Sequence, residues 1–151
     1  MPAPYRRILV ALDGSTESDT ALNIGIETAQ KHDSTLALCH IVDDHTLQEL
    51  RNQNPDLMLH ALLQKGMDII AHGRTQAEDA GLHDVRIFIQ EGSPKEVIPE
   101  VIAKTFVTDL LIAGASGMGH DQSFILGSVS EHTSRTASCD VLLVRNHSSS
   151  P

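Results

Sequence analysis

The feature that most constrains the fold is a regular alternation of short, densely apolar segments with longer segments of helical periodicity. Five apolar segments have the length of β-strands: residues 7–12, 35–42, 85–90, 109–113 and 141–144. Because apolar and polar residues hardly alternate within them, they are typical of parallel strands covered on both faces. Helical spacing of apolar residues predicts helices over residues 16–31, about 55–80, from 94 onward, and, more weakly, over about 128–137.

This order of elements predicts an open, doubly wound α/β fold of Rossmann-like type. Right-handed crossovers would give a five-stranded parallel sheet with helices on both faces. The chain of 151 residues fits one domain of ordinary size. We therefore predict a single domain over residues 1–145, followed by a polar, Ser-rich tail over 146–151 that is expected to fray.

Charge and composition exclude several classes of protein. Eleven Lys and Arg residues against 20 Asp and Glu residues give a net charge of −9, which disfavours binding to nucleic acid or to anionic membrane surfaces. No segment has the length of about 18 apolar residues that a membrane span needs, and the apolar run after Arg7 is too short for a signal peptide. Cys39 and Cys139 lie far apart in apolar runs, which predicts buried free thiols. We expect a soluble, cytoplasmic protein.

The clearest helix start is the segment Ser93-Pro94-Lys95-Glu96. Ser at the N-cap, Pro at the first helical position and Glu three residues after the cap form the pattern of a capping box. We therefore predict that the Ser93 and Glu96 side chains each accept a hydrogen bond from a backbone N–H group at this helix start.

In open parallel sheets, ligands bind beyond the carboxyl ends of the strands, so the residues that follow each strand are the candidates for a site. Asp13 follows the first strand, and Asp43, Asp44 and His45 follow the second, where a solvated loop that starts a helix is the favoured interpretation. After the fourth strand, glycines at 114, 117 and 127 precede a helix that starts near Ser128. Glycines, a strand end and a helix N-terminus form an anion cradle suited to phosphates. An ordinary turn followed by a Ser N-cap fits this spacing equally well.

The spacing Gly114-x2-Gly117-x9-Gly127-Ser128 resembles the nucleotide-binding signature of the universal stress protein family, in its ATP-binding subgroup. The resemblance extends from about residue 5 to 145 and includes the segments RRILVALDGS, ALCHIVD, EGSPKEVI and LGSVSEHTSRTASCDVLLVR. It implies a stress-response protein that binds ATP together with Mg²⁺ or Mn²⁺. The departures from the family pattern are Ser116, His132, Thr133 and Asp140, and none of them replaces a signature glycine or Ser128.

The resemblance also implies which residues bind the nucleotide. Ala11 and Leu12 would form the floor, Asp13 would meet the ribose or a nearby metal, and the backbone of Ile41 would meet the adenine edge. Ribose and phosphates would be lined by Gly114 and Gly117 and held by the segment that opens the last helix. The implied set is Ala11, Leu12, Asp13, Ile41, Ala113, Gly114, Gly117, Gly127, Ser128, Val129 and Ser130.

The same segment argues against rapid catalysis. Phosphoryl transfer needs Lys or Arg on the phosphates, and residues 113–131 contain neither. We therefore assign no catalytic residue and expect at most a very slow ATPase. His120 and Asp121 are interpreted as a solvated loop pair in preference to phosphate or metal contacts, so the metal ligands stay unassigned. The remaining histidines lack the spacing of a zinc site.

The last strand, Val141, Leu142, Leu143 and Val144, is apolar on both faces. At a sheet edge it would invite pairing with another chain, and the resemblance implies a homodimer through this strand. The alternative is an internal strand. We expect a regulatory protein that uses ATP as a ligand and is recognised by an unidentified protein partner. The alternatives are a dimeric scaffold that binds no nucleotide and a slow ATP hydrolase or autophosphorylating protein.

Overall fold

The computed structural model describes residues 5–49, 55–115 and 128–145 and contains one five-stranded sheet. All strand pairs are parallel, and the strand order is β3-β2-β1-β4-β5. The strands are β1 (Arg7–Ala11), β2 (Thr35–Asp43), β3 (Val85–Gly92), β4 (Leu110–Gly114) and β5 (Asp140–Val144). The predicted doubly wound fold is therefore confirmed, with strand bounds within two residues of the prediction.

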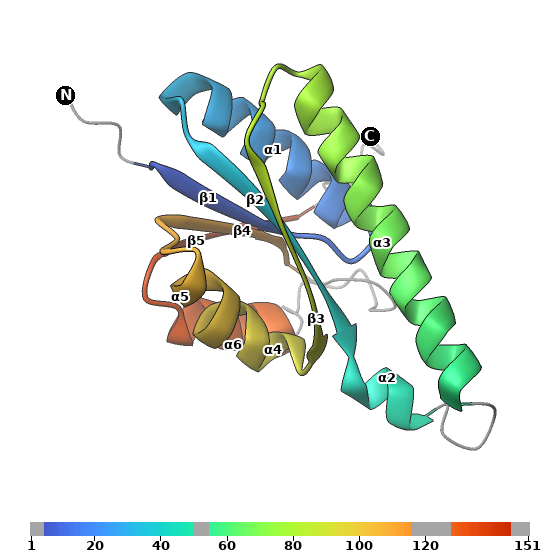
Figure 1. Ribbon diagram of the computed structural model, residues 1–151. Coiled ribbons are helices and arrows are strands. Elements are labelled where there is room, and N and C mark those ends of the chain that lie inside the picture. The colour runs from blue at the N-terminus through green and yellow to red at the C-terminus, as the bar shows by residue number, and fades with distance from the viewer. Residues whose placement is uncertain (1–4, 50–54, 116–127, 146–151) are drawn as a thin grey trace, which may run out of the picture.

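Helices cover both faces of the sheet (Figure 1). One face carries the long-helix layer, which consists of α1 (Thr16–His32) and α3 (Pro55–Asp79). The other face carries the short-helix layer, which consists of α4 (Pro94–Val97), the π-helical turn η1 (Ile98–Ile102), α5 (Ala103–Thr105) and α6 (Ser128–Thr136). A further short helix, α2 (Asp44–Glu49), follows β2 and was not predicted.

Alternate residues of each strand face the two layers, which explains why the strand sequences are apolar throughout. In β1, Ile8 and Val10 belong to the core cluster under the long-helix layer, whereas Leu9 belongs to the cluster under the short-helix layer. Leu38 and Cys39 of β2 divide in the same way. All five side chains have no measurable exposure, so both faces of the sheet are part of a packed core.

The long-helix layer approaches the sheet closely because α1 carries Gly25. A Cβ atom at this position would lie 2.5 Å from Cγ2 of Val10, so any larger residue would push the helix away from β1. The start of α1 is capped by Ser15, whose side chain accepts a hydrogen bond from the Ser18 N–H at 3.1 Å. Asp33 ends the helix in the left-handed conformation, with a φ of 54°.

The predicted capping box at Ser93 is wrong, although the helix starts there as expected, with Pro94 in its first turn. The Ser93 side chain makes no capping hydrogen bond. The backbone carbonyl of Ser93 instead accepts the N–H of Glu96 at 3.0 Å and that of Val97 at 2.8 Å. The N–H group that a capping box would satisfy is therefore already bonded to the backbone.

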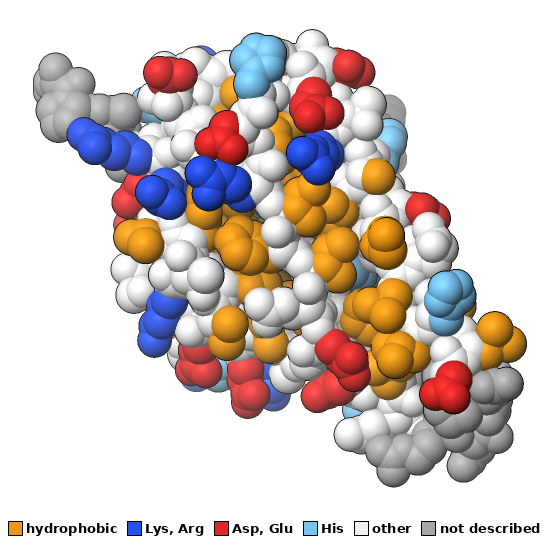
Figure 2. Space-filling model, viewed as in Figure 1, with side chains coloured by type: hydrophobic (Ala, Val, Ile, Leu, Met, Phe, Trp, Pro, Cys, Tyr) orange, Lys and Arg blue, Asp and Glu red, His pale blue; other side chains and the backbone are white. Residues whose placement is uncertain are grey.

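The strand order places β5 at one edge of the described sheet and β3 at the other. The alternative of an internal last strand is thereby excluded, and Leu142 of β5 is 40% exposed. On the face shown in Figure 2, apolar side chains gather over β3 and along α3. Within the described ranges, no helix combines the length and the apolar composition that crossing a membrane requires.

Candidate functional site

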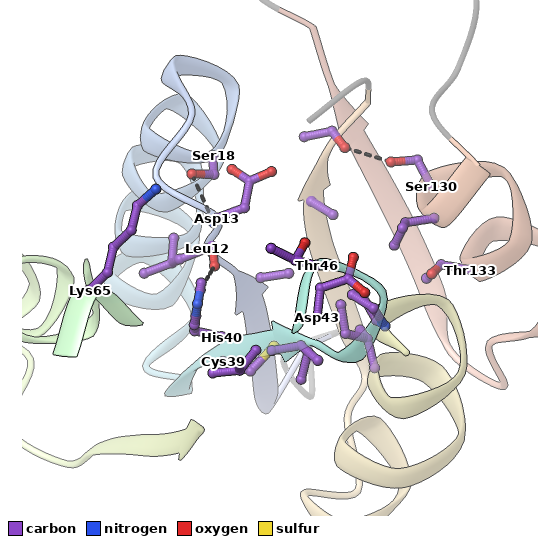
Figure 3. Close-up of a pocket in the computed structure, with 18 of the residues that line it drawn as sticks. Leu12, Asp13, Ser18, Cys39, His40, Asp43, Thr46, Lys65, Ser130 and Thr133 are labelled. Atoms are coloured by element: carbon purple, nitrogen blue, oxygen red, sulfur yellow. Dashed lines mark hydrogen bonds between the residues drawn. The ribbon is translucent and has the colours of Figure 1, made fainter. Parts of the chain in front are cut away.

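A cavity of about 520 Å³ lies at the carboxyl ends of β1, β2 and β4, bordered by α3 on one side and by α4 and α6 on the other (Figure 3). It brings together residues from six separate segments of the chain. Eight of the eleven predicted site residues line it: Ala11, Leu12, Asp13, Ile41, Ala113, Gly114, Val129 and Ser130. Gly117 and Gly127 lie outside the described residues, and Ser128 is described only as the first residue of α6. Nucleotide contact by these residues remains a prediction.

Asp13 stands where β1 meets α1, and local hydrogen bonds fix the turn around it. The Asp13 carboxylate oxygen Oδ1 accepts the N–H of Ser15 at 2.9 Å. Ser15 in turn caps α1, so the carboxylate and the helix start form one hydrogen-bonded unit. The turn therefore holds an acidic side chain at the rim of the cavity.

His40 braces the ends of β1 and β2 and was not among the predicted site residues. Its ring nitrogen Nδ1 lies 2.8 Å from the carbonyl oxygen of Leu12. Because a carbonyl can only accept, Nδ1 carries the proton in this contact. Gly66 of α3 leaves room for the ring, since a Cβ there would lie 2.6 Å from His40 Cδ2. Gly66 of α3 is therefore needed to accommodate the His40 ring on the cavity wall.

Ser130 joins the first turn of α6 to the end of β4. Its Oγ donates to the carbonyl oxygen of Gly114 at 2.6 Å, and the Ser130 residue is only 6% exposed. With the single hydroxyl proton engaged, this side chain can donate to a ligand only by giving up Gly114. The backbone N–H groups of the first turn of α6 are the donors that the helix itself leaves unpaired.

Gly114 is needed for packing as well as for the cavity. A Cβ at this position would lie 2.9 Å from Cβ of Glu17 on α1. The absence of a side chain therefore lets the end of β4 approach the start of α1. The sequence pattern left a phosphate cradle and an ordinary turn open at Gly114 and did not indicate this contact with α1.

Further residues outside the predicted set also line the cavity. Lys65 of α3 lines the cavity, far along the chain from the glycine signature, and no local pattern marks it. Asp43 also lines the cavity, while its Oδ1 accepts the N–H of His45 at 2.9 Å at the start of α2. Asp44 and His45 are exposed, as the interpretation as a solvated segment predicts, but they lie in helix α2 and not in a loop, and Asp43 is half-buried.

The two cysteines are free thiols, as predicted, but only one is fully buried. Cys39 lies on the cavity wall, and burial raises its pKa to about 12. Burial also raises the pKa of Cys139, which is half-buried. Both groups are therefore neutral at physiological pH and are poor nucleophiles. The described part of the chain contains no cluster of three or more His, Cys, Asp or Glu residues that could hold a metal ion.

Comparison with known proteins places this fold and cavity in a family. The model of the universal stress protein family matches residues 4–145. A putative universal stress protein of Staphylococcus aureus strain USA300 is 34% identical over 142 residues, which cover 93% of this chain and 84% of that protein.

Solved structures of two universal stress proteins have a similar fold. UspA from Lactobacillus plantarum matches with a TM-score of 0.81 at 23% identity, covering 93% of this chain and 98% of that one. A universal stress protein in complex with cAMP matches with a TM-score of 0.64 at 24% identity, covering 93% of this chain and 96% of that one. With the family match spanning nearly the whole chain, the conclusion is that this protein belongs to the universal stress protein family.

Proposed function

We propose that this protein is an ATP-binding regulator of the stress response, in which the nucleotide acts as a ligand and is not rapidly turned over. The observation that carries the proposal is the convergence of eight predicted site residues on one cavity. The cavity is within the size range of small-molecule sites and lies where open α/β sheets bind ligands. The cAMP complex of a universal stress protein supports an adenine nucleotide as the ligand class.

The walls of the cavity differ in a way that suits the parts of a nucleotide. The start of α6, with Val129 and Ser130, would hold phosphates through unpaired backbone N–H groups and the positive end of the helix dipole. Asp13 would meet the ribose, and the apolar side chains of Ile41 and Ile98 would lie against the base. These residues fit ATP. A bound Mg²⁺ or Mn²⁺ would be held chiefly by the phosphates. Asp13 is the one carboxylate among the predicted site residues and is the candidate protein ligand.

The charges around the cavity favour binding over catalysis. Among the described lining residues, Lys65 is the only Lys or Arg. Phosphoryl-transfer enzymes place several cationic groups on the transferred phosphate. We therefore propose turnover slower than about one per second, below the usual range for enzymes.

The edge position of β5 supports a homodimer. Val141, Leu142, Leu143 and Val144 belong to a strand that has no neighbour on one side within the described residues, a surface suited to a second copy of the chain. We propose that nucleotide binding changes the surface of this dimer in the cytoplasm and that a protein partner recognises the change. Only a difference in affinity between two states can transmit such a signal.

The proposed function is tested by titrating the purified protein with ATP and Mg²⁺ in a calorimeter. Val129→Glu places a negative charge on the cavity wall, whereas Ser134→Glu places the same charge on the exposed side of α6. Val129→Glu should weaken ATP binding by about tenfold or more, as expected for a like charge beside the phosphates, and Ser134→Glu should leave it nearly unchanged.

The outcomes separate the three functions. Binding of ATP with intact nucleotide recovered after denaturation supports the regulatory function. Recovery of ADP from protein loaded with ATP favours the slow hydrolase. No binding at millimolar ATP, together with a dimer in sedimentation velocity, would leave the scaffold as the function.

A further inference from the structure

The wall of the cavity formed by α6 contains a buried hydroxyl group that the proposed function does not use. Thr133 lies one helical turn after Val129, and both residues line the cavity. Thr133 is 2% exposed, and its Oγ1 has no hydrogen-bond partner among the described residues. Figure 3 shows this side chain at the edge of the cavity, on the side opposite His40 and Lys65.

Three other threonines in the helices of this protein satisfy their hydroxyl groups locally. Thr20, Thr28 and Thr136 each donate to the carbonyl oxygen four residues earlier, at distances of 3.1, 2.7 and 2.9 Å. This back-bonding is the usual arrangement for helical threonine. Thr133 does not bond to Val129 in this way, although it lies in the same kind of helix. Its hydroxyl group is therefore available to another partner.

In the protein without a ligand, the unpaired Thr133 hydroxyl is destabilising. A buried polar group without a partner is unfavourable, whereas valine has nearly the same shape and no group to satisfy. Packing by itself would thus be served better by valine. Because Thr133 lines the cavity, its hydroxyl is within reach of a molecule that enters the cavity.

We propose that the Thr133 hydroxyl forms a hydrogen bond with the base of the bound nucleotide and is a specificity-determining residue of the site. The inference rests on the proposed nucleotide binding. Phosphates would lie at the first turn of α6, and Thr133 is about 6 Å farther along the helix axis than Val129, from the rise of 1.5 Å per residue. The side chains of Ile41, Pro94 and Ile98 make the neighbouring wall apolar.

An apolar wall with one hydrogen-bonding group suits an uncharged, planar heterocycle. The faces of the base would pack against the aliphatic side chains, and one nitrogen or amino group on its edge would pair with Thr133 Oγ1. Threonine has two accessible χ1 rotamers in a helix, so rotation of the side chain lets the hydroxyl follow the ligand.

The test compares Thr133→Val with the matched control Thr108→Val. Thr108 also has a buried Oγ1 without a partner in the described ranges, but it does not line the cavity. Binding of ATP and of AMP, each with Mg²⁺, is measured by calorimetry. Thr133→Val should weaken both nucleotides by the same factor of about five to ten, because the base is common to them. Thr133→Ser keeps the hydroxyl and should stay within about twofold of the wild type.

Thermal unfolding without nucleotide controls for misfolding. Both valine variants should unfold at the same temperature as the wild type or about 2–4 °C higher, since each removes an unsatisfied group. Thr108→Val should bind both nucleotides as the wild type does.

Three results would overturn the assignment. Unchanged affinity in Thr133→Val would mean that the hydroxyl is not used, and a loss for ATP but not for AMP would place it at the outer phosphates. A wild-type chain that binds neither nucleotide would overturn the proposed function itself. That last result differs from the first two because it appears before any variant is made.

Discussion

The two helical layers on this sheet differ in regularity. The long-helix layer consists of two uninterrupted helices, and α1 is capped at both ends by specific side-chain and backbone contacts. Its core cluster contains only aliphatic side chains. The short-helix layer is divided into segments of four, five, three and nine residues, and α4 begins without a side-chain cap. It contains a thiol in its core cluster and an unpaired hydroxyl in α6.

The difference concerns how the two faces are packed, since both layers contribute to the cavity wall, the long-helix layer through Ser18, Leu62 and Lys65. Close packing of long helices supplies stability, because aliphatic burial is the main favourable term in folding. Short, interrupted helices with buried polar groups are less favourable on the same criterion. The short-helix layer supplies Pro94, Ile98 and the α6 residues to the cavity wall.

The largest effect is expected from truncating matched leucines on the two faces. Leu38 of β2 packs under the long-helix layer and Leu9 of β1 under the short-helix layer, and neither has measurable exposure. Leu→Ala substitutions in cores cost about 2–5 kcal/mol, depending on how far the surroundings collapse. We expect Leu38→Ala near the upper end, about 4 kcal/mol, because long helices relax less, and Leu9→Ala near the lower end, about 2–3 kcal/mol.

Urea unfolding of both variants measures these costs as shifts in the midpoint at constant slope. Equal losses of unfolding free energy in the two variants would show that the short-helix layer is as rigid as the long-helix layer. The two layers would then differ in the lengths of their helices but not in rigidity.

A second prediction concerns the pH dependence of stability, which follows from the burial of Cys39. In the folded chain the pKa of Cys39 is raised from 9.0 to about 12, so the unfolded chain loses this proton first as pH rises. The unfolded state then binds fewer protons than the native state, and stability falls between pH 9 and 12, by about 1.4 kcal/mol per pH unit. Below pH 9 the contribution of Cys39 is fully present and does not depend on pH.

The measurement is the difference in unfolding free energy between the wild type and Cys39→Ala at pH 8 and at pH 10.5. The advantage of the wild type should shrink at the higher pH, because only the wild type has this thiol to ionise on unfolding. Cys139→Ala is the matched control, and its half-buried thiol should give a weaker dependence. A difference that does not vary with pH would mean that Cys39 ionises without unfolding.

The smallest effect compares two helix starts. Ser15 bonds to the Ser18 N–H, whereas the Ser93 side chain makes no capping bond. Ser15→Ala should therefore destabilise the protein by about 1 kcal/mol, and Ser93→Ala by only a few tenths of that amount. Thermal or urea unfolding distinguishes the two. A loss at Ser93 as large as that at Ser15 would indicate that a capping bond forms there in solution.

Much of the fold could be predicted because the strands are short, dense apolar runs, which are typical of parallel strands covered on both faces. The predicted starts at Thr16, Pro55, Pro94 and Ser128 agree with the helix bounds, since Pro and Ser mark such positions locally. The capping box at Ser93 failed because the competing acceptor is a backbone carbonyl, which every residue has. Helix α2 was missed because six residues are too few for a periodic signal.

The candidate site also contains some residues that could be predicted from the sequence and some that could not. Residues directly after strands, such as Asp13 and Gly114, could be predicted because strand ends meet at one edge of the sheet. Lys65 could not, because its place on the cavity wall depends on where α3 lies against the sheet, and His40 could not, because its ring is held by the carbonyl oxygen of Leu12 from a distant segment. The cavity role of Thr133 was equally hidden, since a threonine in a polar helix carries no sign of whether its hydroxyl is paired.

The order of elements, the fold class and the strand ends at which a ligand would bind could all be predicted, because they follow from local periodicity and from small residues at turns. Three features are visible only in the folded chain: β5 is an edge strand, Ser130 donates to Gly114, and Thr133 is buried without a partner among the described residues. Each of these depends on which groups from distant segments come within bonding distance. That proximity is a property of the packed chain and has no local signature.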